Sequence, residues 1–442
     1  MAENNIKSAT KTVDEKKKNN SVVNDNQIEE KAKKILRIGG RWYKKAIDPL
    51  TKQETRYQIL ASMIIADEGK EVGNLILQAA PKYLAETNIP SHIDYQECID
   101  NGDGEFFFNI YRPLSHTPSE GEWKHIEKLL RHIFQEQYEM GLDYVQIMYE
   151  QPLHSLPILL LVSNETGTGK STFCKFLNYI FGENALPLTP EIVESRFNSF
   201  WVGKLIGYIE EQAEDSKERR QQTAKVKNIV TAETLPRESK GKDPTLAYNF
   251  LKIIICSNDE YTPVKIDAND TRYWVRKVPA LSKEEESVDI LEECKKEIPA
   301  FMYMLQNRKK QTERQNRLWF SPKDIQTDAW KKIVEASKST LERGIIAMIE
   351  EIMMLKGTDK VLYSISELYS VLITSEFLSD KDRRNFSRVS LRDMLRNWGL
   401  NAPRRNIRHN VYQIIDGKIS ECNVSSKAIT FTRQDLKRIK CE

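Results

Sequence analysis

The segment Ser163-Asn-Glu-Thr-Gly-Thr-Gly-Lys-Ser-Thr172 has the residue types of a phosphate-binding loop. Glycines let backbone N–H groups close around phosphate oxygens, and the N-terminus of a following helix favours anions. At this spacing the Lys170 amine would reach the β- and γ-phosphates, and the Ser171 hydroxyl would bind Mg²⁺. We therefore predict that ATP and Mg²⁺ bind here, at Asn164, Glu165, Thr166, Gly167, Thr168, Gly169, Lys170, Ser171 and Thr172.

One position departs from the standard pattern, because Asn164 stands where the first glycine is usual. Asn tolerates a left-handed backbone better than other non-glycine residues, so we expect the loop to form. The alternative is a chance Gly-x-Gly-Lys-Ser in a turn. The apolar run before the loop and the helical spacing of apolar residues after it argue against chance.

Two acids follow a second apolar run, in Lys204-Leu-Ile-Gly-Tyr-Ile-Glu-Glu211. At the end of a buried strand, one carboxylate can hold Mg²⁺ while the other polarises the attacking water. We predict that Glu210 is the metal-side residue and Glu211 the catalytic base. Two solvated acids that begin a helix are the alternative interpretation.

Further along, Asn258 ends a third apolar run and is placed to hydrogen-bond the γ-phosphate or its water. Asn is also common in turns at strand ends, which is the simpler interpretation. Arg272 and Arg276 follow, and either could be an arginine finger that stabilises charge on a neighbouring subunit's phosphoryl group. We favour Arg272, because the strand that follows it would fix its position, whereas Arg276 could equally form a strand-end salt bridge.

The elements that must position these residues are short apolar strands separated by helices. Ile158–Val162, Leu205–Ile209 and Ile253–Cys256 are fully apolar, as expected for parallel strands covered on both faces. The predicted fold class is therefore α/β, with a P-loop ATPase core built on a parallel sheet.

Between the acids and Asn258, Lys240-Gly-Lys242 precedes Asp243-Pro244 and is typical of a hairpin tip. Lysines at such tips are usually only solvated. In a ring of identical subunits, however, Lys240 and Lys242 would point into a central channel. A basic channel that follows a phosphate backbone is a common way to hold single-stranded nucleic acid.

The rest of the chain divides by composition. We predict a disordered, Lys/Asn/Glu-rich tail over 1–34, a small α+β domain over 35–115, and a helical segment over 116–155. The helix in that segment most simply faces the core, and a subunit interface is the second interpretation. The ATPase core follows over 156–310, then a linker over 311–339.

Over 340–442, three predicted helices precede two β-like pieces, Val411–Ile415 and Ala428–Thr432, which is the order of a winged helix. Arg388, Arg392 and Arg396 are four residues apart on one helical face. Together with Arg404 and Arg405 they are predicted to grip DNA phosphates, although charge runs usually mark solvated faces.

Charge supports this prediction once it is counted by segment. The 442 residues carry 67 Lys+Arg and 64 Asp+Glu, a net charge of only +3, but residues 381–442 hold 15 basic and 6 acidic side chains. Six cysteines without a C-x-x-C pair fit a reducing cytoplasm, without a disulfide framework or zinc site. Neither a membrane span nor a secretion signal is evident.

As a set, these motifs resemble the superfamily 3 helicases, more narrowly the helicase part of the phage and mobile-element primase-helicase family, related to the virulence-associated protein E group. The resemblance spans about Gly104 to Leu281. Its matching stretches are Phe107–Leu114, Trp123–His132, Gly167–Thr172, Gln221–Pro244, Ser257–Glu260 and Arg272–Pro279.

The resemblance implies a AAA+-type ATPase that assembles into a ring, usually a hexamer, and translocates on single-stranded or forked DNA, typically 3′ to 5′. It implies the roles given above for Lys170, Ser171, Glu210, Glu211, Asn258 and an Arg near 272. The Glu-Glu pair departs from the Asp found in many relatives. Nothing resembles a primase catalytic site, so we expect any priming to belong to another chain or to the host.

Two other functions stay open from the sequence. A replication initiator or regulator would use ATP only to assemble on DNA, without unwinding. A small-molecule kinase built on the same loop would be a monomer, and it would leave Lys240, Lys242 and the basic C-terminal region unexplained. The favoured prediction is a DNA helicase of a mobile genetic element, acting in the cytoplasm of a bacterial host.

Overall fold

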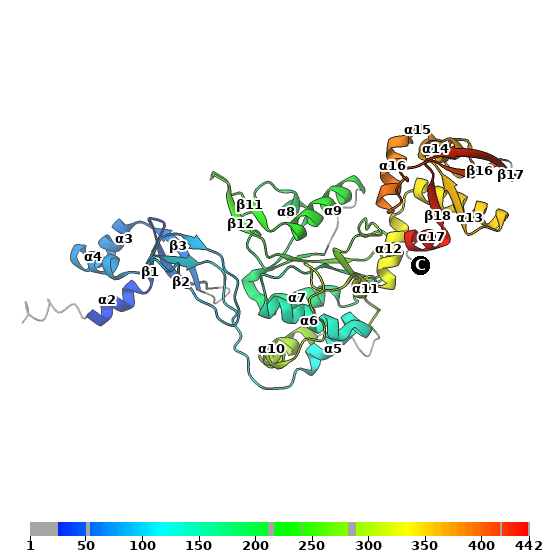
Figure 1. Cartoon of the computed structure of the whole chain (residues 1–442). Helices are drawn as coiled ribbons and strands as arrows, with labels where there is room; N and C mark the ends of the chain where they lie inside the picture. Colours follow the sequence, from blue (N-terminus) through cyan, green and yellow to red (C-terminus); the bar gives the residue numbers. More distant parts are fainter. Residues whose placement is uncertain are drawn as a thin grey trace, which may run out of the picture. The chain divides into compact units, whose positions relative to one another are not determined.

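The computed structural model describes residues 25–49, 54–210, 216–241, 243–281, 289–415 and 418–440, and of residues 216–221, 380, 381 and 385 it describes the backbone alone. The chain divides into two compact units, residues 1–113 and 114–442, whose elements are labelled in Figure 1. Among the described helices none is long and apolar enough to cross a bilayer.

The first unit is a small α+β domain. Its sheets have the strand orders β3-β2-β1-β4 and β5-β7-β6. Its elements are α2 (Asp25–Ala32), β1 (Ile35–Ile38), β2 (Arg41–Ile47), β3 (Glu54–Ile59), α3 (Ala61–Glu68), α4 (Lys70–Ala79), β4 (Lys82–Tyr83), β5 (Glu86–Thr87), β6 (Cys98–Asp100) and β7 (Phe106–Asn109).

Helix α2 corrects the predicted tail. Ile28 and Ala32, one helical turn apart, are buried in the core of the first unit with Ile35 and Ile64. Two apolar residues among charged neighbours are too weak a pattern to predict a helix, and only their packing partners stabilise it. Of the predicted tail, residues 1–24 lie outside the described residues.

The second unit is built on a five-stranded sheet of order β14-β8-β13-β10-β9, in which every neighbouring pair is parallel. All five residues of β8 are buried, as the apolar run predicted. The α/β class with a parallel sheet is thereby observed. The strands are β8 (Ile158–Val162), β9 (Ala185–Pro187), β10 (Ile206–Ile209), β13 (Lys252–Ser257) and β14 (Tyr273–Lys277).

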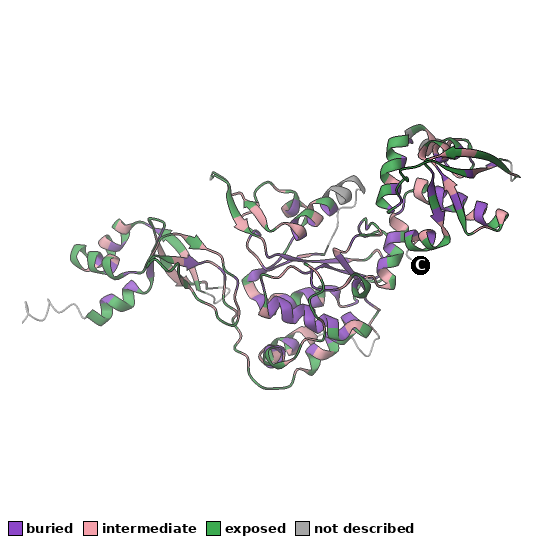
Figure 2. Cartoon of the chain, in the orientation of Figure 1, coloured by how far each residue is buried: buried purple, intermediate pink, exposed green. Residues whose placement is uncertain are grey.

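Helices cover both faces of this sheet, as Figure 1 shows, and Figure 2 shows the strands buried between them. One face carries α5 (Lys124–Phe134), α6 (Tyr138–Glu150), α7 (Lys170–Phe181) and α10 (Ile290–Asn307). The other carries α8 (Pro190–Glu194), α9 (Ser216–Thr231) and the hairpin of β11 (Thr234–Arg237) and β12 (Thr245–Tyr248).

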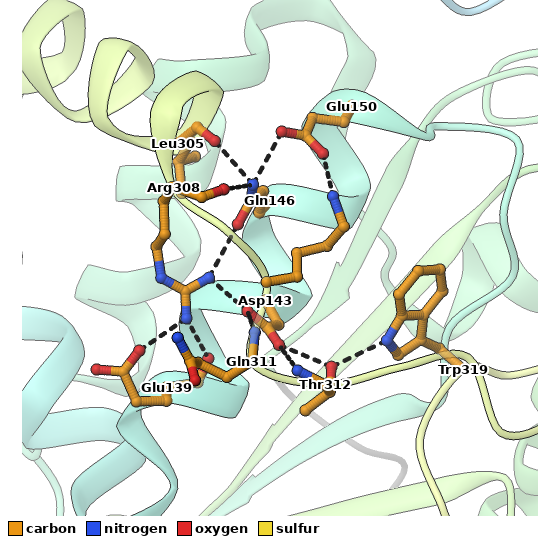
Figure 3. Close-up of polar contacts among 10 residues, drawn as sticks. Glu139, Asp143, Gln146, Glu150, Leu305, Arg308, Gln311, Thr312 and Trp319 are labelled. Atoms are coloured by element: carbon orange, nitrogen blue, oxygen red, sulfur yellow. Dashed lines mark hydrogen bonds and ion pairs between the residues drawn. The ribbon is translucent and has the colours of Figure 1, made fainter.

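The predicted linker, residues 311–339, packs against the rest of the second unit together with the end of the predicted core at Arg308. Figure 3 shows it held against α6, where Arg308 pairs with the fully buried Asp143. Both the backbone N–H and the hydroxyl of Thr312 donate to Asp143 Oδ2, at 2.6 and 2.7 Å. Beyond it, α11 (Pro322–Ile325) and α12 (Asp328–Ser337) follow, and α12 adds Trp330, Ile333 and Val334 to the core of the sheet.

The C-terminal region has its own hydrophobic core, formed by residues between 341 and 439. Its elements are α13 (Thr340–Lys356), β15 (Lys360–Tyr363), α14 (Ile365–Thr374), α15 (Asp380–Asn385), α16 (Arg388–Asn397), β16 (Ile407–Ile415), β17 (Lys418–Ser426), β18 (Ile429–Thr432) and α17 (Arg433–Lys440).

The hairpin of this region differs from the predicted one. β16 pairs with β17, and β18 pairs with β15 instead. The sequence Lys418-Ile-Ser-Glu-Cys-Asn-Val-Ser-Ser426 shows little apolar alternation, because most of its side chains are exposed and packing does not select them. The three predicted helices correspond to α13, α14 and α16, but β15 follows the first of them and a fourth helix, α15, precedes the last.

Candidate nucleotide-binding site

The strand order brings the predicted motifs together at the carboxyl ends of the strands. β13 lies between β8 and β10, and all three strands run in the same direction. Their carboxyl ends therefore lie side by side: the phosphate-binding loop after β8, Asn258 after β13, and Glu210 after β10. Ligands of open α/β sheets bind at such carboxyl ends.

The loop has the backbone that the glycines predict. Gly167 and Gly169 have φ of +70° and +87°, a region that side chains rarely adopt. Lys170 then begins α7, so the first N–H groups of that helix face the loop. The backbone of Asn164 does not have a positive φ, which explains why glycine is not required there.

Glu260, which the sequence did not single out, holds the start of the loop. Its Oε1 accepts a hydrogen bond from the backbone N–H of Asn164 at 3.1 Å. Its Oε2 lies 3.0 Å from the Nζ of Lys277, at the end of β14. Glu260 is buried, so this ion pair fixes the loop to the neighbouring strand. Only the strand order, which places β14 beside β8, could have revealed the contact.

The Lys170 amine is turned back onto the loop. It donates to Thr168 Oγ1 at 2.9 Å and to the carbonyl of Glu165 at 3.2 Å. Burial lowers the pKa of this amine below its usual value, because a charge in a buried place loses hydration. A phosphate group in the loop would offset that loss, so the buried lysine favours an anionic ligand.

Ser171 and Glu210 are the residues that would hold Mg²⁺. Ser171 is exposed in the first turn of α7, and Glu210 is exposed just after β10. The Cys174 thiol lies on the same helix. Its pKa is raised by a hydrogen bond with Cys256 and by burial. Hydroxyl and carboxylate oxygens suit this hard ion, and phosphates supply the remaining ligands. Glu211 lies outside the described residues.

A cavity of about 980 Å³ opens over the loop, within the range of small-molecule sites. Residues 166–172 and Asn258 line it, so the structure brings Lys170, Ser171 and Asn258 together. The opposite wall is helix α5, whose apolar side is buried in the core, as the simpler interpretation predicts. Its polar face contributes Lys124, Glu127, Lys128, Arg131 and His132.

The two candidate arginines lie at opposite ends of strand β14. Arg272 precedes β14, at the amino end of the strand and away from the loop of its own subunit. It pairs with the buried Asp270 at 2.7 Å. Arg276 lies near the loop edge, but its side chain is only 4% exposed. It donates to the Phe134 carbonyl and to Gln137 Oε1, both at 2.7 Å. Arg276 is therefore committed to internal contacts.

The predicted DNA-binding side chains are exposed where the structure describes them. Lys240 lies in the turn between β11 and β12, beside Gly241 with its φ of +73°. Lys242 lies outside the described residues. In the C-terminal region the exposed arginines are Arg388, Arg392 and Arg396 on α16, and Arg404 and Arg405 before β16.

Comparison with known proteins agrees with this fold. Residues 161–276 match a family described as "family of unknown function (DUF5906)". The chain is similar to the apo structure of the NrS-1 C-terminal region, with a TM-score of 0.60 and 18% identity over 89% of this chain and 95% of that one. An A-form apo structure of that region gives a TM-score of 0.55 and 17% identity over 83% and 84%. No curated protein matches. At these identities the likeness establishes the fold alone.

Proposed function

We propose that this protein is an ATP-dependent DNA helicase of the ring-forming superfamily 3 type, acting in the replication of a phage or another mobile genetic element. The observation that carries the proposal is the cavity at the carboxyl edge of the sheet. There Lys170 and Ser171 of the loop meet Asn258 from the adjacent strand. The likeness in fold to the NrS-1 C-terminal region supports it.

In this proposal the triphosphate of ATP binds in the loop. Lys170 would leave Thr168 and contact the β- and γ-phosphates, and Ser171 and Glu210 would hold Mg²⁺, which would neutralise charge on the phosphate oxygens. Glu211 accepts the proton of the attacking water, and Asn258 orients that water or the γ-phosphate.

The DNA contacts follow from the basic side chains. Lys240 and Lys242 at the β11–β12 turn would hold the backbone of single-stranded DNA in the channel of a homo-oligomeric ring, for which six subunits are expected. The winged-helix-like C-terminal region would hold DNA phosphates. A separate primase or host replication proteins would complete the reaction in the bacterial cytoplasm.

The test is strand displacement on a forked DNA, with ATP and with a non-hydrolysable analogue. We expect unwinding with ATP only. Lys170→Ala and Glu211→Gln should each abolish DNA-stimulated hydrolysis. The double variant Lys240→Ala with Lys242→Ala should keep basal hydrolysis and lose unwinding.

Three outcomes would contradict the proposal. Nucleotide-dependent assembly on DNA without displacement would indicate an initiator or regulator. Hydrolysis indifferent to DNA would favour a kinase-like enzyme. Normal unwinding by the Lys240→Ala, Lys242→Ala double variant would show that these lysines do not hold DNA in the channel.

A further inference from the structure

His132 of α5 lines the cavity and contacts the backbone of the phosphate-binding loop. Its Nε2 lies 3.0 Å from the carbonyl oxygen of Thr168. A carbonyl can only accept, so Nε2 must carry the hydrogen and donate it. This assignment of the ring hydrogen follows from the partner. It holds for the neutral ring and for the imidazolium alike.

The bond controls the peptide group between Thr168 and Gly169. In a planar trans peptide the C=O and the N–H point in opposite directions. When His132 holds the carbonyl on the α5 side, the N–H of Gly169 is directed away from α5. Gly169, with φ of +87° and no side chain, would otherwise let this peptide rotate with little hindrance.

Helix α5 is rigid enough to act as this support. Phe134, near its end, stacks on Trp274 of β14 with ring centroids 5.3 Å apart. The same ring meets Phe173 of α7 edge-on at 5.5 Å. Arg276 then donates to the Phe134 carbonyl at 2.7 Å. The end of α5 that carries His132 is thus packed on α7, which follows the loop, and on β14, which lies beside the strand that precedes the loop.

We propose that His132 is a positioning residue of the nucleotide site, which orients the Thr168–Gly169 peptide so that its N–H faces the phosphates before they arrive. The inference rests on the proposed function, since it requires that a nucleoside triphosphate occupies the loop. His132 acts through the loop backbone and not on the reacting atoms. Its loss should therefore weaken nucleotide binding more than it slows turnover.

The test compares His132→Ala, His132→Asn and His132→Gln in the full chain. The amide nitrogen of Gln lies as many bonds from Cβ as the Nε2 of His, whereas that of Asn lies one carbon short. We expect Ala and Asn to raise the Kd for a fluorescent ADP analogue, and the KM for ATP, about five- to tenfold. The kcat should stay within about twofold, and Gln should restore both constants to within about twofold of the native values.

The inference is overturned if His132→Ala and His132→Asn bind the analogue as tightly as the native chain. It is also overturned if His132→Gln binds the analogue as weakly as His132→Ala while both variants keep the native melting temperature. Should Ala fail to fold, the comparison of Asn with Gln decides. Lys170→Ala distinguishes a failure of the His132 proposal from a failure of the proposed function. If Lys170→Ala loses nucleotide binding and the His132 variants keep it, only the role of His132 is wrong. If the native chain binds no nucleotide, the proposed function fails with it.

Discussion

Arg272 and Arg276 lie four residues apart, at opposite ends of strand β14. Arg276 is enclosed by the end of α5, so it supports the fold. Arg272 is 29% exposed and lies away from its own loop, so it could reach a nucleotide only on a neighbouring subunit. Its pairing with Asp270 would hold the guanidinium in one orientation.

We expect Arg272→Ala to bind nucleotide normally and to lose DNA-stimulated hydrolysis by at least about 100-fold, since arginine fingers act on the transition state. Mixing two inactive variants tests whether Arg272 acts on the nucleotide of a neighbouring subunit. Lys170→Ala subunits keep Arg272, and Arg272→Ala subunits keep an intact loop, so a mixture should regain hydrolysis that neither variant shows alone. A mixture as inactive as its parts would contradict the assignment.

Lys252, the first residue of β13, provides a pH-dependent test of stability. Its amine is fully buried, donates to the carbonyl of Phe250 at 2.8 Å and also donates to that of Pro152. Burial lowers its pKa to about 7. The unfolded chain keeps a lysine pKa of about 10.4, so between these values the unfolded state binds a proton that the folded state does not. Raising the pH through this window therefore stabilises the fold.

Compared with Lys252→Met, the native chain should gain about 1.4 kcal/mol of unfolding free energy per pH unit between about pH 7.5 and 9.5. Urea unfolding at three pH values in that window measures the difference, and the variant cancels the contribution of all other groups. Parallel pH profiles for the two chains would show that Lys252 stays charged in the folded state.

At the scale of elements, the segment after α10 is joined to α6 by one buried carboxylate. The Asp143 side chain is 0% exposed and accepts from Arg308 and from Thr312 (Figure 3). Glu139, one turn earlier on α6, pairs with the same arginine at 2.7 Å but is 57% exposed. The two acids bind the same arginine but differ in burial, so replacing each in turn measures how burial changes the stability that an ion pair contributes.

Asp143→Ala should lower the unfolding free energy by about 3–5 kcal/mol, because it leaves a largely buried guanidinium without its main partner. Glu139→Ala should cost less than about 1 kcal/mol, since water replaces an exposed carboxylate. Chemical denaturation of both variants measures this. Equal losses would mean that the segment is held mainly by its apolar residues.

At the scale of the whole molecule, a net charge of +3 conceals a basic C-terminal region. Arg388, Arg392 and Arg396 are all exposed on α16. If each neutralises one phosphate, replacing all three by Gln should weaken DNA binding for every sequence alike. The log–log slope of affinity against salt should become shallower by up to about 2.7.

Titrations of the full chain on duplex and on single-stranded DNA at several salt concentrations measure the slope. A triple Lys→Gln variant on a helix of the first unit, such as Lys31, Lys33 and Lys34 at the end of α2 and just after it, controls for net charge. An unchanged slope for the arginine variant would place the DNA contacts elsewhere.

The sequence by itself determined the class of the fold and predicted the position of the loop after β8. Gly167, Gly169, Lys170 and Ser171 are local requirements of phosphate binding, and apolar runs such as Ile158–Val162 follow from burial on both faces. Each of these signals lies within a few consecutive residues, where spacing and residue type suffice.

Only the tertiary structure decided which distant residues meet at that loop. The strand order placed Asn258 beside the loop and Arg272 at the opposite end of the strands, and it brought Glu260 to the loop backbone. The packing of α5 brought His132 to that backbone. These contacts join residues 36 to 96 positions apart in the chain. No periodicity encodes them, because they depend on the packing of whole strands and helices and not on the local preferences of either partner.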